Sequence, residues 1–228
     1  MQDSFLKRML RHIVFGLEDG SVSTLGAVTG IAIGTQNAAV VLLSGLVIIA
    51  VEALSMGAGT YLSSKATRKA YEATITKLHK ALHAKPGIER SHLVKYYQHC
   101  GLTKDHAEKV VSNIASDHKA LLMDLEAHEI KVTPDSLENA AESGLVMWVA
   151  YVVGGVVPLV FYWALGLPQA IYWSVAGTLV FLFLVGFTKA RVTGEKPLSS
   201  ALEMLAVSAS AALIGLVVGR LASLGLGI

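Results

Sequence analysis

Five long apolar runs alternate with short polar stretches along the chain, and one polar block of about 80 residues interrupts them. The apolar runs cover about 13–33, 38–63, 144–165, 170–188 and 198–221. A helix needs about 20 mostly apolar residues to cross a bilayer, and each run is close to that length. We therefore predict an all-α membrane protein with five transmembrane helices and a helical insertion between helices 2 and 3.

The polar block also has a helical pattern. The second apolar run continues into it without a break and should end before Pro86, because the residue before a proline disfavours helical geometry. Three more helices are predicted, over about 88–99, 104–116 and 117–130. Gly101 suits the position just after a helix end, and Thr103 can cap the next helix.

The basic residues predict the orientation of the chain, since Lys and Arg are retained on the cytoplasmic side. With five crossings, the N-terminal arm, the polar block and the loop 189–197 share one side. They hold three, twelve and three of the 19 basic residues, and Arg220 alone lies near the opposite face. We predict a cytoplasmic N-terminus, a cytoplasmic helical domain over 64–143, and membrane domains over 1–63 and 144–228.

Composition supports this class. The chain is 53% hydrophobic and 16% charged, whereas a soluble domain carries about 25% charged residues. A single cysteine, Cys100, excludes an internal disulfide and a cysteine-rich metal site. The first apolar run is too long for a cleavable signal peptide. The expected surroundings are a lipid bilayer, either a prokaryotic inner membrane or a vacuole-type membrane, and no nucleic acid partner is expected.

Two acidic residues, Glu18 and Asp19, lie within the first apolar run. An acidic group in a transmembrane helix costs about 2.5–3.5 kcal/mol on insertion scales. Such groups usually face a cavity, a partner or an ion path. Both could instead lie solvated in the headgroup region, and Asp19 is the stronger candidate for a function. Glu203, near the start of the fifth run, is interpreted as an interfacial group that reaches water.

Asp19, Met56 and Glu52 are expected to line one path. At about 1.5 Å per residue, Asp19 lies roughly 9 Å below the cytoplasmic face, and Met56, on the antiparallel second helix, roughly 10 Å below it. Glu52 lies one turn deeper on the face of Met56. Carboxylates suit hard or borderline divalent cations, while a thioether favours softer ones over Mg²⁺ or Ca²⁺. Plain packing is the alternative for Met56 taken alone.

Small residues recur four positions apart on the apolar runs, as Gly16/Gly20, Gly26/Gly30, Ser55/Gly59 and Gly215/Gly219. This spacing lets helices approach closely, within one chain or between two chains. Five helices give a thin wall around an ion path, so we expect a homodimer to enclose it.

Several segments taken together resemble the vacuolar iron transporter family. They are IVFGLEDGSVSTLGAVTG, ALSMGAGTYLSSKA, Gly101-Leu102, and KARVTG followed by ALEMLAVSASAALIGLVVGRL. The resemblance covers essentially the whole chain. It implies a homodimeric exporter of cytosolic Fe²⁺, and often Mn²⁺, that exchanges the metal for protons. It also implies that Asp19 and Met56 belong to the ion path, while Ile48 replaces a further acid for which Glu52 can substitute.

The resemblance implies a cytoplasmic metal cluster as well, and this chain departs from its pattern. Glu89 and Glu129 match glutamate positions, His92 stands in place of another glutamate, and Glu126 occupies a methionine position. Apolar residues take three further ligand positions, namely Leu78, Ala81 and Leu125. Fewer carboxylates weaken the attraction for hard cations, and histidine shifts the preference toward Mn, Fe, Co, Ni or Zn. His79 and His83, one helical turn apart, are either a ligand pair or solvated surface groups.

The predicted function is export of a divalent transition metal, Fe²⁺ or Mn²⁺, in exchange for protons. Protons can compete because carboxylates in low-dielectric surroundings have raised pKa values. The alternative is a membrane-tethered metal-binding or sensing protein that transports nothing. An enzyme is not expected, since the apolar runs contain no nucleophile–base pair and no H-E-x-x-H motif. No prosthetic group is expected either.

Overall fold

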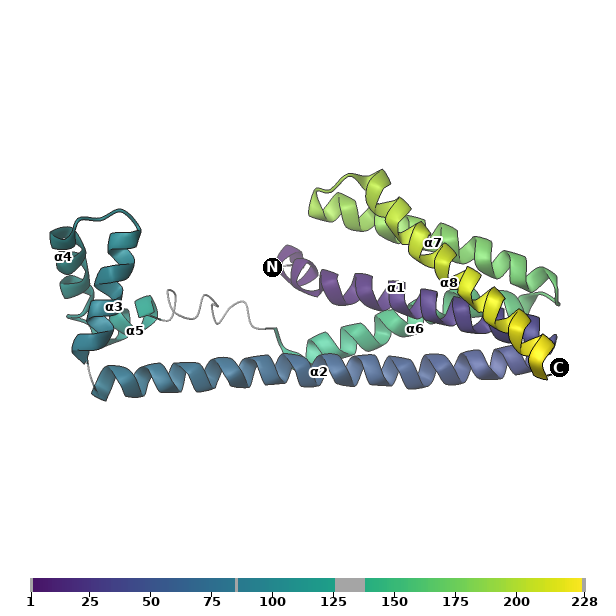
Figure 1. Cartoon of the computed structure of the whole chain (residues 1–228), viewed down its shortest axis with the longest axis horizontal. Helices are drawn as coiled ribbons and strands as arrows, with labels where there is room; N and C mark the ends of the chain where they lie inside the picture. The colour runs from purple at the N-terminus through teal and green to yellow at the C-terminus, as the bar shows by residue number, and fades with distance from the viewer. Residues whose placement is uncertain (1, 85, 126–137, 227–228) are drawn as a thin grey trace. The chain divides into compact units, whose positions relative to one another are not determined.

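The computed structural model describes residues 2–84, 86–125 and 138–226. Within these ranges the chain forms eight helices, which are α1 (Gln2–Thr35), α2 (Ala38–Ala84), α3 (Pro86–His99), α4 (Lys104–Ile114), α5 (His118–Leu125), α6 (Ala140–Ala164), α7 (Gln169–Thr193) and α8 (Pro197–Leu226) (Figure 1). They belong to two units. The helical bundle consists of Met1–Tyr61 and Ala140–Ile228, and the polar unit consists of Leu62–Asn139.

The helix limits follow the sequence pattern closely. Helix α2 runs unbroken through the second apolar run to Ala84, as predicted, and α3 begins at Pro86, two residues earlier than expected. Gly101 follows α3 with a φ of 98°, a left-handed conformation that glycine adopts without strain. Thr103 occupies the N-cap position of α4 with an extended backbone, as predicted, although its side chain makes no capping hydrogen bond.

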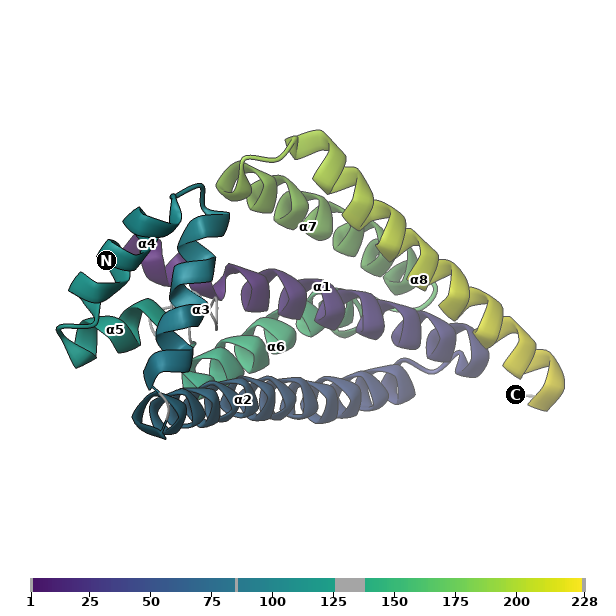
Figure 2. The same cartoon turned by 60° about the vertical axis from the view of Figure 1, so that its left-hand side comes forward.

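Four helices of the described chain are long and apolar enough to cross a membrane, namely Ala38–Lys80, Ala140–Ala164, Gln169–Thr193 and Pro197–Gly225. Helix α1 is not among them, because Glu18, Asp19 and several serines and threonines lower its hydropathy. It lies in the middle of the bundle, with α2 and α6 on one side and α7 and α8 on the other (Figures 1 and 2). A helix covered by other helices can be less apolar than one that faces lipid.

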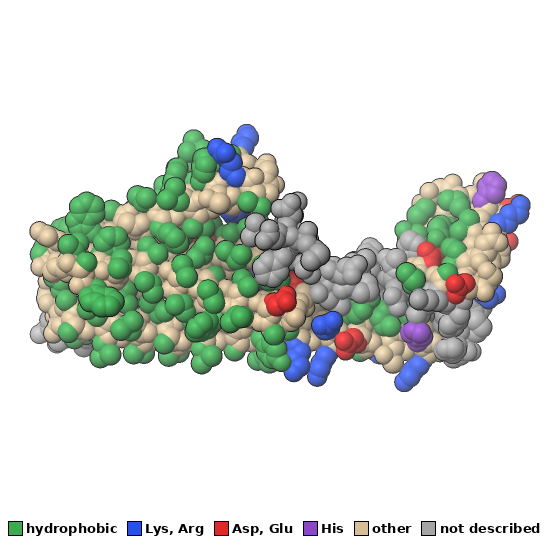
Figure 3. Space-filling view, turned by 180° about the vertical axis from the view of Figure 1, so that it is seen from behind, with side chains coloured by type: hydrophobic (Ala, Val, Ile, Leu, Met, Phe, Trp, Pro, Cys, Tyr) green, Lys and Arg blue, Asp and Glu red, His purple; other side chains and the backbone are tan. Residues whose placement is uncertain are grey.

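The outer surface of the bundle is apolar. In the view of Figure 3, hydrophobic side chains cover the bundle, while most charged side chains and the histidines in view lie on the polar unit. Large apolar residues such as Leu54, Trp163 and Leu213 are exposed on α2, α6 and α8. Exposed apolar surface of this extent indicates contact with lipid or with partners rather than with water. The fold is therefore that of a helical membrane protein.

Small residues bring α1 close to two neighbouring helices. A Cβ atom added at Gly16 would lie 2.7 Å from the Cβ of Ala150 on α6, and one added at Gly30 would lie 2.9 Å from the carbonyl oxygen of Gly215 on α8. The Gly16/Gly20, Gly26/Gly30 and Gly215/Gly219 pairs are thus used within the chain. In contrast, a Cβ added at Gly59 would meet nothing within 4 Å among the described atoms.

Pro158 interrupts the hydrogen bonding of α6, and a serine of α1 compensates. Proline has no N–H, so the carbonyl of Gly154 loses its partner within the helix. The Ser21 hydroxyl of α1 donates to that carbonyl at 2.9 Å, and the Ser174 hydroxyl of α7 donates to the carbonyl of Pro158 at 2.8 Å. The carbonyl that Pro158 leaves without a helical partner is therefore satisfied in an interior where water is excluded.

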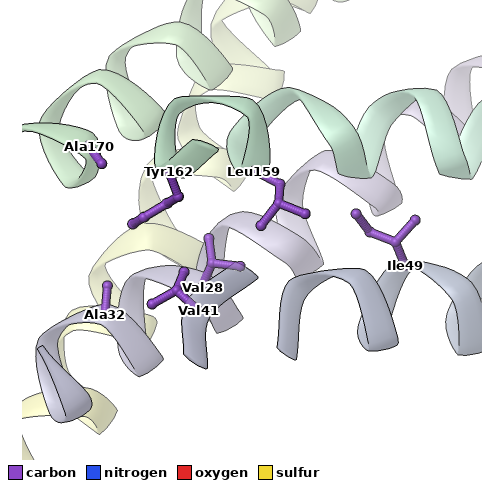
Figure 4. Close-up of a cluster of buried hydrophobic side chains, with 7 residues drawn as sticks. All are labelled: Val28, Ala32, Val41, Ile49, Leu159, Tyr162 and Ala170. Carbon is purple, nitrogen blue, oxygen red and sulfur yellow. The ribbon is translucent and has the colours of Figure 1, made fainter. Parts of the chain in front are cut away.

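An apolar cluster closes the bundle near the turn between α1 and α2 (Figure 4). Helices α1, α2, α6 and α7 contribute its buried members, which are Val28, Ala32, Val41, Ile49, Leu159, Tyr162 and Ala170. Their side chains point toward one another in the close-up (Figure 4). This end of the bundle is packed without charged groups among the cluster's members.

The polar unit has an apolar core of its own. Its buried members come one from each of four helices, and they are Leu78, Leu93, Val111 and Leu121. Beside this core the hydroxyl of Tyr97 donates to both carboxylate oxygens of Asp124, at 3.0 and 3.1 Å. Burial, together with the Asp124 carboxylate, raises the pKa of Tyr97 to about 12.

We expect Gly215→Ala to destabilise the bundle by about 1–3 kcal/mol, as overpacking typically does. The new methyl group would fall on the carbonyl oxygen of Gly26 and force α1 and α8 apart. Gly225→Ala is the matched control in the same helix, because a Cβ there meets no described atom within 4 Å. Denaturant titration of both variants in detergent micelles measures the difference. Equal stabilities would contradict the close contact.

The Tyr97 hydrogen bond predicts a pH dependence. The pKa of Tyr97 in the folded protein, about 12, exceeds the ordinary value of 10. Its contribution to stability is therefore complete below pH 10 and is lost as the pH rises toward 12. We expect the tyrosinate absorbance difference between wild type and Tyr97→Phe to stay small at pH 11. A difference that titrates near pH 10 would show that the bond to Asp124 is absent.

Candidate functional site

Three side chains from three helices meet inside the helical bundle. The Ser23 hydroxyl of α1 donates to Oε2 of Glu52 on α2 at 3.0 Å, and the Tyr151 hydroxyl of α6 donates to the same oxygen. The two hydroxyls also lie 2.5 Å from each other. Tyr151 is fully buried. We call these three residues the Glu52 triad.

The Glu52 triad sets the register between the antiparallel helices α1 and α2. Asp19 lies one turn before Ser23 on α1, and Met56 lies one turn after Glu52 on α2, so both lie on the same side of the triad. Asp19 is also within electrostatic reach of Glu52. All three predicted path residues, Asp19, Glu52 and Met56, are half-buried.

This arrangement offers ligands of two kinds. Asp19 and Glu52 present carboxylate oxygens, and Met56 presents a thioether sulfur one turn from Glu52. In the described part of the chain Oε1 of Glu52 accepts no hydrogen bond, whereas Oε2 accepts two. A divalent transition metal accepts both oxygen and sulfur ligands. The residues present therefore suit a passing metal ion better than an anion or an organic substrate.

Glu18 has different neighbours from Asp19. It lies within electrostatic reach of Lys189 on α7, and Lys189 also pairs with Glu195 at 3.8 Å. A carboxylate that faces a lysine is partly neutralised without a metal ion. This supports the assignment of Asp19, rather than Glu18, to the candidate site. Glu203 is exposed on α8, as expected for an interfacial group.

The predicted cytoplasmic cluster falls largely outside the described residues. Glu126 and Glu129 lie in the segment that is not described, and the side chain of Glu89 is also outside it. His92 is exposed on α3. Among the side chains that are described, no three His, Cys, Asp or Glu residues come together to hold a metal ion. The cytoplasmic site stays a prediction.

Ser23 and Tyr151 were not predicted from the sequence. Ser23 carries a weak signal, since it follows Asp19 by one turn and so shares its helix face. Tyr151 is one of several aromatic residues in an apolar run, and nothing local marks its hydroxyl as a partner of Glu52. Its role depends on the rotation of α6 about its axis, which the sequence pattern leaves open.

Apolar helices that surround a layer of carboxylate and hydroxyl groups define a multi-pass membrane protein with a polar site in its interior. The chain belongs to the VIT family, whose model matches residues 10–220. Proteins of this family are transporters and not enzymes.

Named relatives agree with this assignment. The chain is 30% identical over 211 residues to "Vacuolar iron transporter 2" of Oryza sativa subsp. japonica, covering 91% of this chain and 86% of the relative. It is 29% identical to "Vacuolar iron transporter 1" of the same plant, over 91% of this chain and 84% of the relative. It is 28% identical to "Vacuolar iron transporter 1" of Arabidopsis thaliana, over 89% and 82%.

The Glu52 triad predicts energetic coupling between Tyr151 and Glu52. In a double-mutant cycle with Tyr151→Phe and Glu52→Gln, we expect a coupling of about 0.5–3 kcal/mol in the free energy of unfolding. The reason is that Tyr151→Phe removes the hydrogen bond, while Glu52→Gln removes the negative charge that strengthens it. A parallel cycle with Tyr151→Phe and Glu203→Gln should be additive. Additivity in both cycles would contradict the triad.

Proposed function

We propose that this chain exports Fe²⁺ from the cytosol, and Mn²⁺ as a second substrate, through a path lined by Asp19, Met56 and Glu52. The relatives named above are iron transporters by their names, and the ligands of the candidate site suit a borderline divalent cation. The observation that carries the proposal is the Ser23–Glu52 hydrogen bond, because Asp19 and Met56 each lie one turn from it on the same side.

The proposed topology has five crossings, with α1 as the crossing that the other helices cover. The N-terminus and the polar unit are then cytoplasmic. Three, twelve and three of the 19 basic residues lie in the arm, the block 64–143 and the loop 189–197, as the retention of positive charge on that side requires. The host is a vacuole-type membrane or a prokaryotic inner membrane.

Protons are the proposed counter-ions. A carboxylate that has lost its bound metal in a low-dielectric path takes up a proton more readily than one in water. Ser23 and Tyr151 hold one oxygen of Glu52 in place, so the other oxygen is free to alternate between a metal ion and a proton. Metal moving out and protons moving in would thus use the same carboxylates.

Two further parts complete the proposal. A homodimer would supply the second wall of the path, and α2 carries two small residues, Ser55 and Gly59, that are exposed among the described residues. In the cytoplasmic domain Glu89, His92, Glu126 and Glu129 would collect metal ahead of Met56. Leu78, at one of the replaced ligand positions, is buried in the apolar core of the polar unit.

Uptake of radioactive iron into proteoliposomes tests the proposal. With an acidic interior and Fe²⁺ outside at neutral pH, we expect wild type to accumulate the metal and Asp19→Asn to lose at least about 90% of the initial rate. That loss corresponds to a rise of about 1.4 kcal/mol in the activation free energy of transport. Met56→Leu, which keeps the volume but removes the sulfur, should also slow uptake.

Glu203→Gln is the matched control, because it neutralises an exposed acid of the same bundle. We expect it to transport within about two-fold of wild type, since exposed charges away from a site contribute little. Uptake that is unchanged by Asp19→Asn would overturn the proposed metal path. Uptake that is unchanged when the pH gradient is collapsed would overturn the proton exchange. Metal binding without accumulation would favour a metal sensor.

A further inference from the structure

A cavity of about 470 Å³ opens at the end of the helical bundle where α1 turns into α2. Its lining comes from the end of α1, the start of α7 and the end of α8, and includes Ile33, Gln36, Ile171, Tyr172, Arg220 and Ser223. One cation, two hydroxyl groups and an amide therefore share the cavity with apolar side chains. Its described lining contains no acidic residue.

Arg220 has no structural explanation in the bundle itself. All 18 other lysines and arginines lie in the N-terminal arm, the polar block or the loop 189–197. The last turn of α8 carries no basic residue, so Arg220 lies too far from the helix end to offset its dipole. Among the described carboxylates none pairs with Arg220, and its side chain is exposed. A guanidinium in this setting is suited to an external anion.

Exposed aromatic residues mark the level of the cavity in the membrane. Trp163, Tyr172 and Trp173 are 84%, 73% and 59% exposed at the turn between α6 and α7. Aromatic side chains of this kind gather where a bilayer meets water, at the depth of the lipid headgroups. Tyr172 itself lines the cavity.

Arg220 lies at the same depth as this aromatic group. Helices α7 and α8 form an antiparallel pair joined by a short turn. Tyr172 lies about 32 Å from the end of α7, and Arg220 lies about 35 Å from the start of α8, at about 1.5 Å per residue. The cavity therefore opens at headgroup depth, where phospholipid phosphates are abundant and free solutes are not concentrated.

We propose that this cavity binds a phosphate group, namely that of an anionic phospholipid such as phosphatidylglycerol. The Arg220 guanidinium pairs with the phosphate through its forked N–H groups, and the hydroxyl of Tyr172 lies beside it. The acyl chains run along Ile33 and Ile171 toward the apolar outer surface. An anionic headgroup fits better than a zwitterionic one, because the described lining offers no acid for a choline or ammonium group. The site requires membrane insertion but not the proposed metal path.

Thermal unfolding in mixed micelles tests the site on the full chain. We expect phosphatidylglycerol to raise the wild-type midpoint by about 5 °C more than phosphatidylcholine does. Arg220→Gln should lose at least half of that shift, while Lys104→Gln, which removes an exposed lysine of the polar unit, should keep it. Native mass spectrometry should show that wild type and Lys104→Gln retain more phosphatidylglycerol molecules than Arg220→Gln does.

Arg220→Lys keeps the positive charge but loses the paired N–H groups of the guanidinium. It is the second variant to use if Arg220→Gln does not fold. It should retain less phosphatidylglycerol than wild type does. A separate unfolding experiment adds inorganic phosphate at millimolar concentration without lipid. An equal shift with free phosphate would overturn the lipid assignment in favour of a soluble anion. Equal shifts with both lipids, or an unchanged shift in Arg220→Gln, would overturn the site itself.

Discussion

The hydrogen bonds of the Glu52 triad are the constraint on which the rest of the structure depends. A carboxylate inside an apolar bundle is costly unless it is paired, and Ser23 and Tyr151 provide its partners from two other helices. Because each partner belongs to a different helix, the triad fixes α1, α2 and α6 in one register. The close approach of α1 to α6 at Gly16 brings the two backbones near enough for these short contacts.

The position of α1 explains how one helix can carry both polar and acidic groups. Its neighbours cover Ser21, Thr24 and Thr29 completely or almost completely, so these groups do not meet lipid. Ser21 in turn satisfies the carbonyl that Pro158 leaves without a partner in α6. The cluster around Val28 and Leu159 is apolar (Figure 4), and buried hydroxyl groups such as those of Thr29, Ser174 and Thr178 lie elsewhere in the bundle. The Glu52 triad thus places a half-buried carboxylate among hydroxyl groups from two other helices.

Helix limits and depth could be predicted from the sequence, because both follow from local composition and from the fixed rise of a helix. The run of α2 to Ala84 is of this kind. The shared depth of Asp19 and Met56 rests on the same fixed rise and stays a prediction. The hydrogen-bond partners of Glu52 could not be predicted from the sequence, since they depend on how the helices are rotated about their axes. For the same reason the sequence left open whether Gly26 and Gly215 pair within a chain. Glu18 and Asp19 indicated that α1 does not simply face lipid, but not which helices cover it. The N-cap position of Thr103 was predicted correctly, whereas the missing side-chain bond depends on a rotamer that the sequence does not specify.

Cross-linking of paired cysteines tests the shared level of Asp19 and Met56 most directly. In a background that carries Cys100→Ser, a short bismaleimide should join Asp19→Cys to Met56→Cys within one chain. It should not join Asp19→Cys to Leu54→Cys, because Leu54 lies on the exposed face of α2. A cross-linked monomer for the 19/56 pair alone is the predicted result. Cross-linking of 19/54 but not of 19/56 would show that the acid and the sulfur face different sides of the bundle.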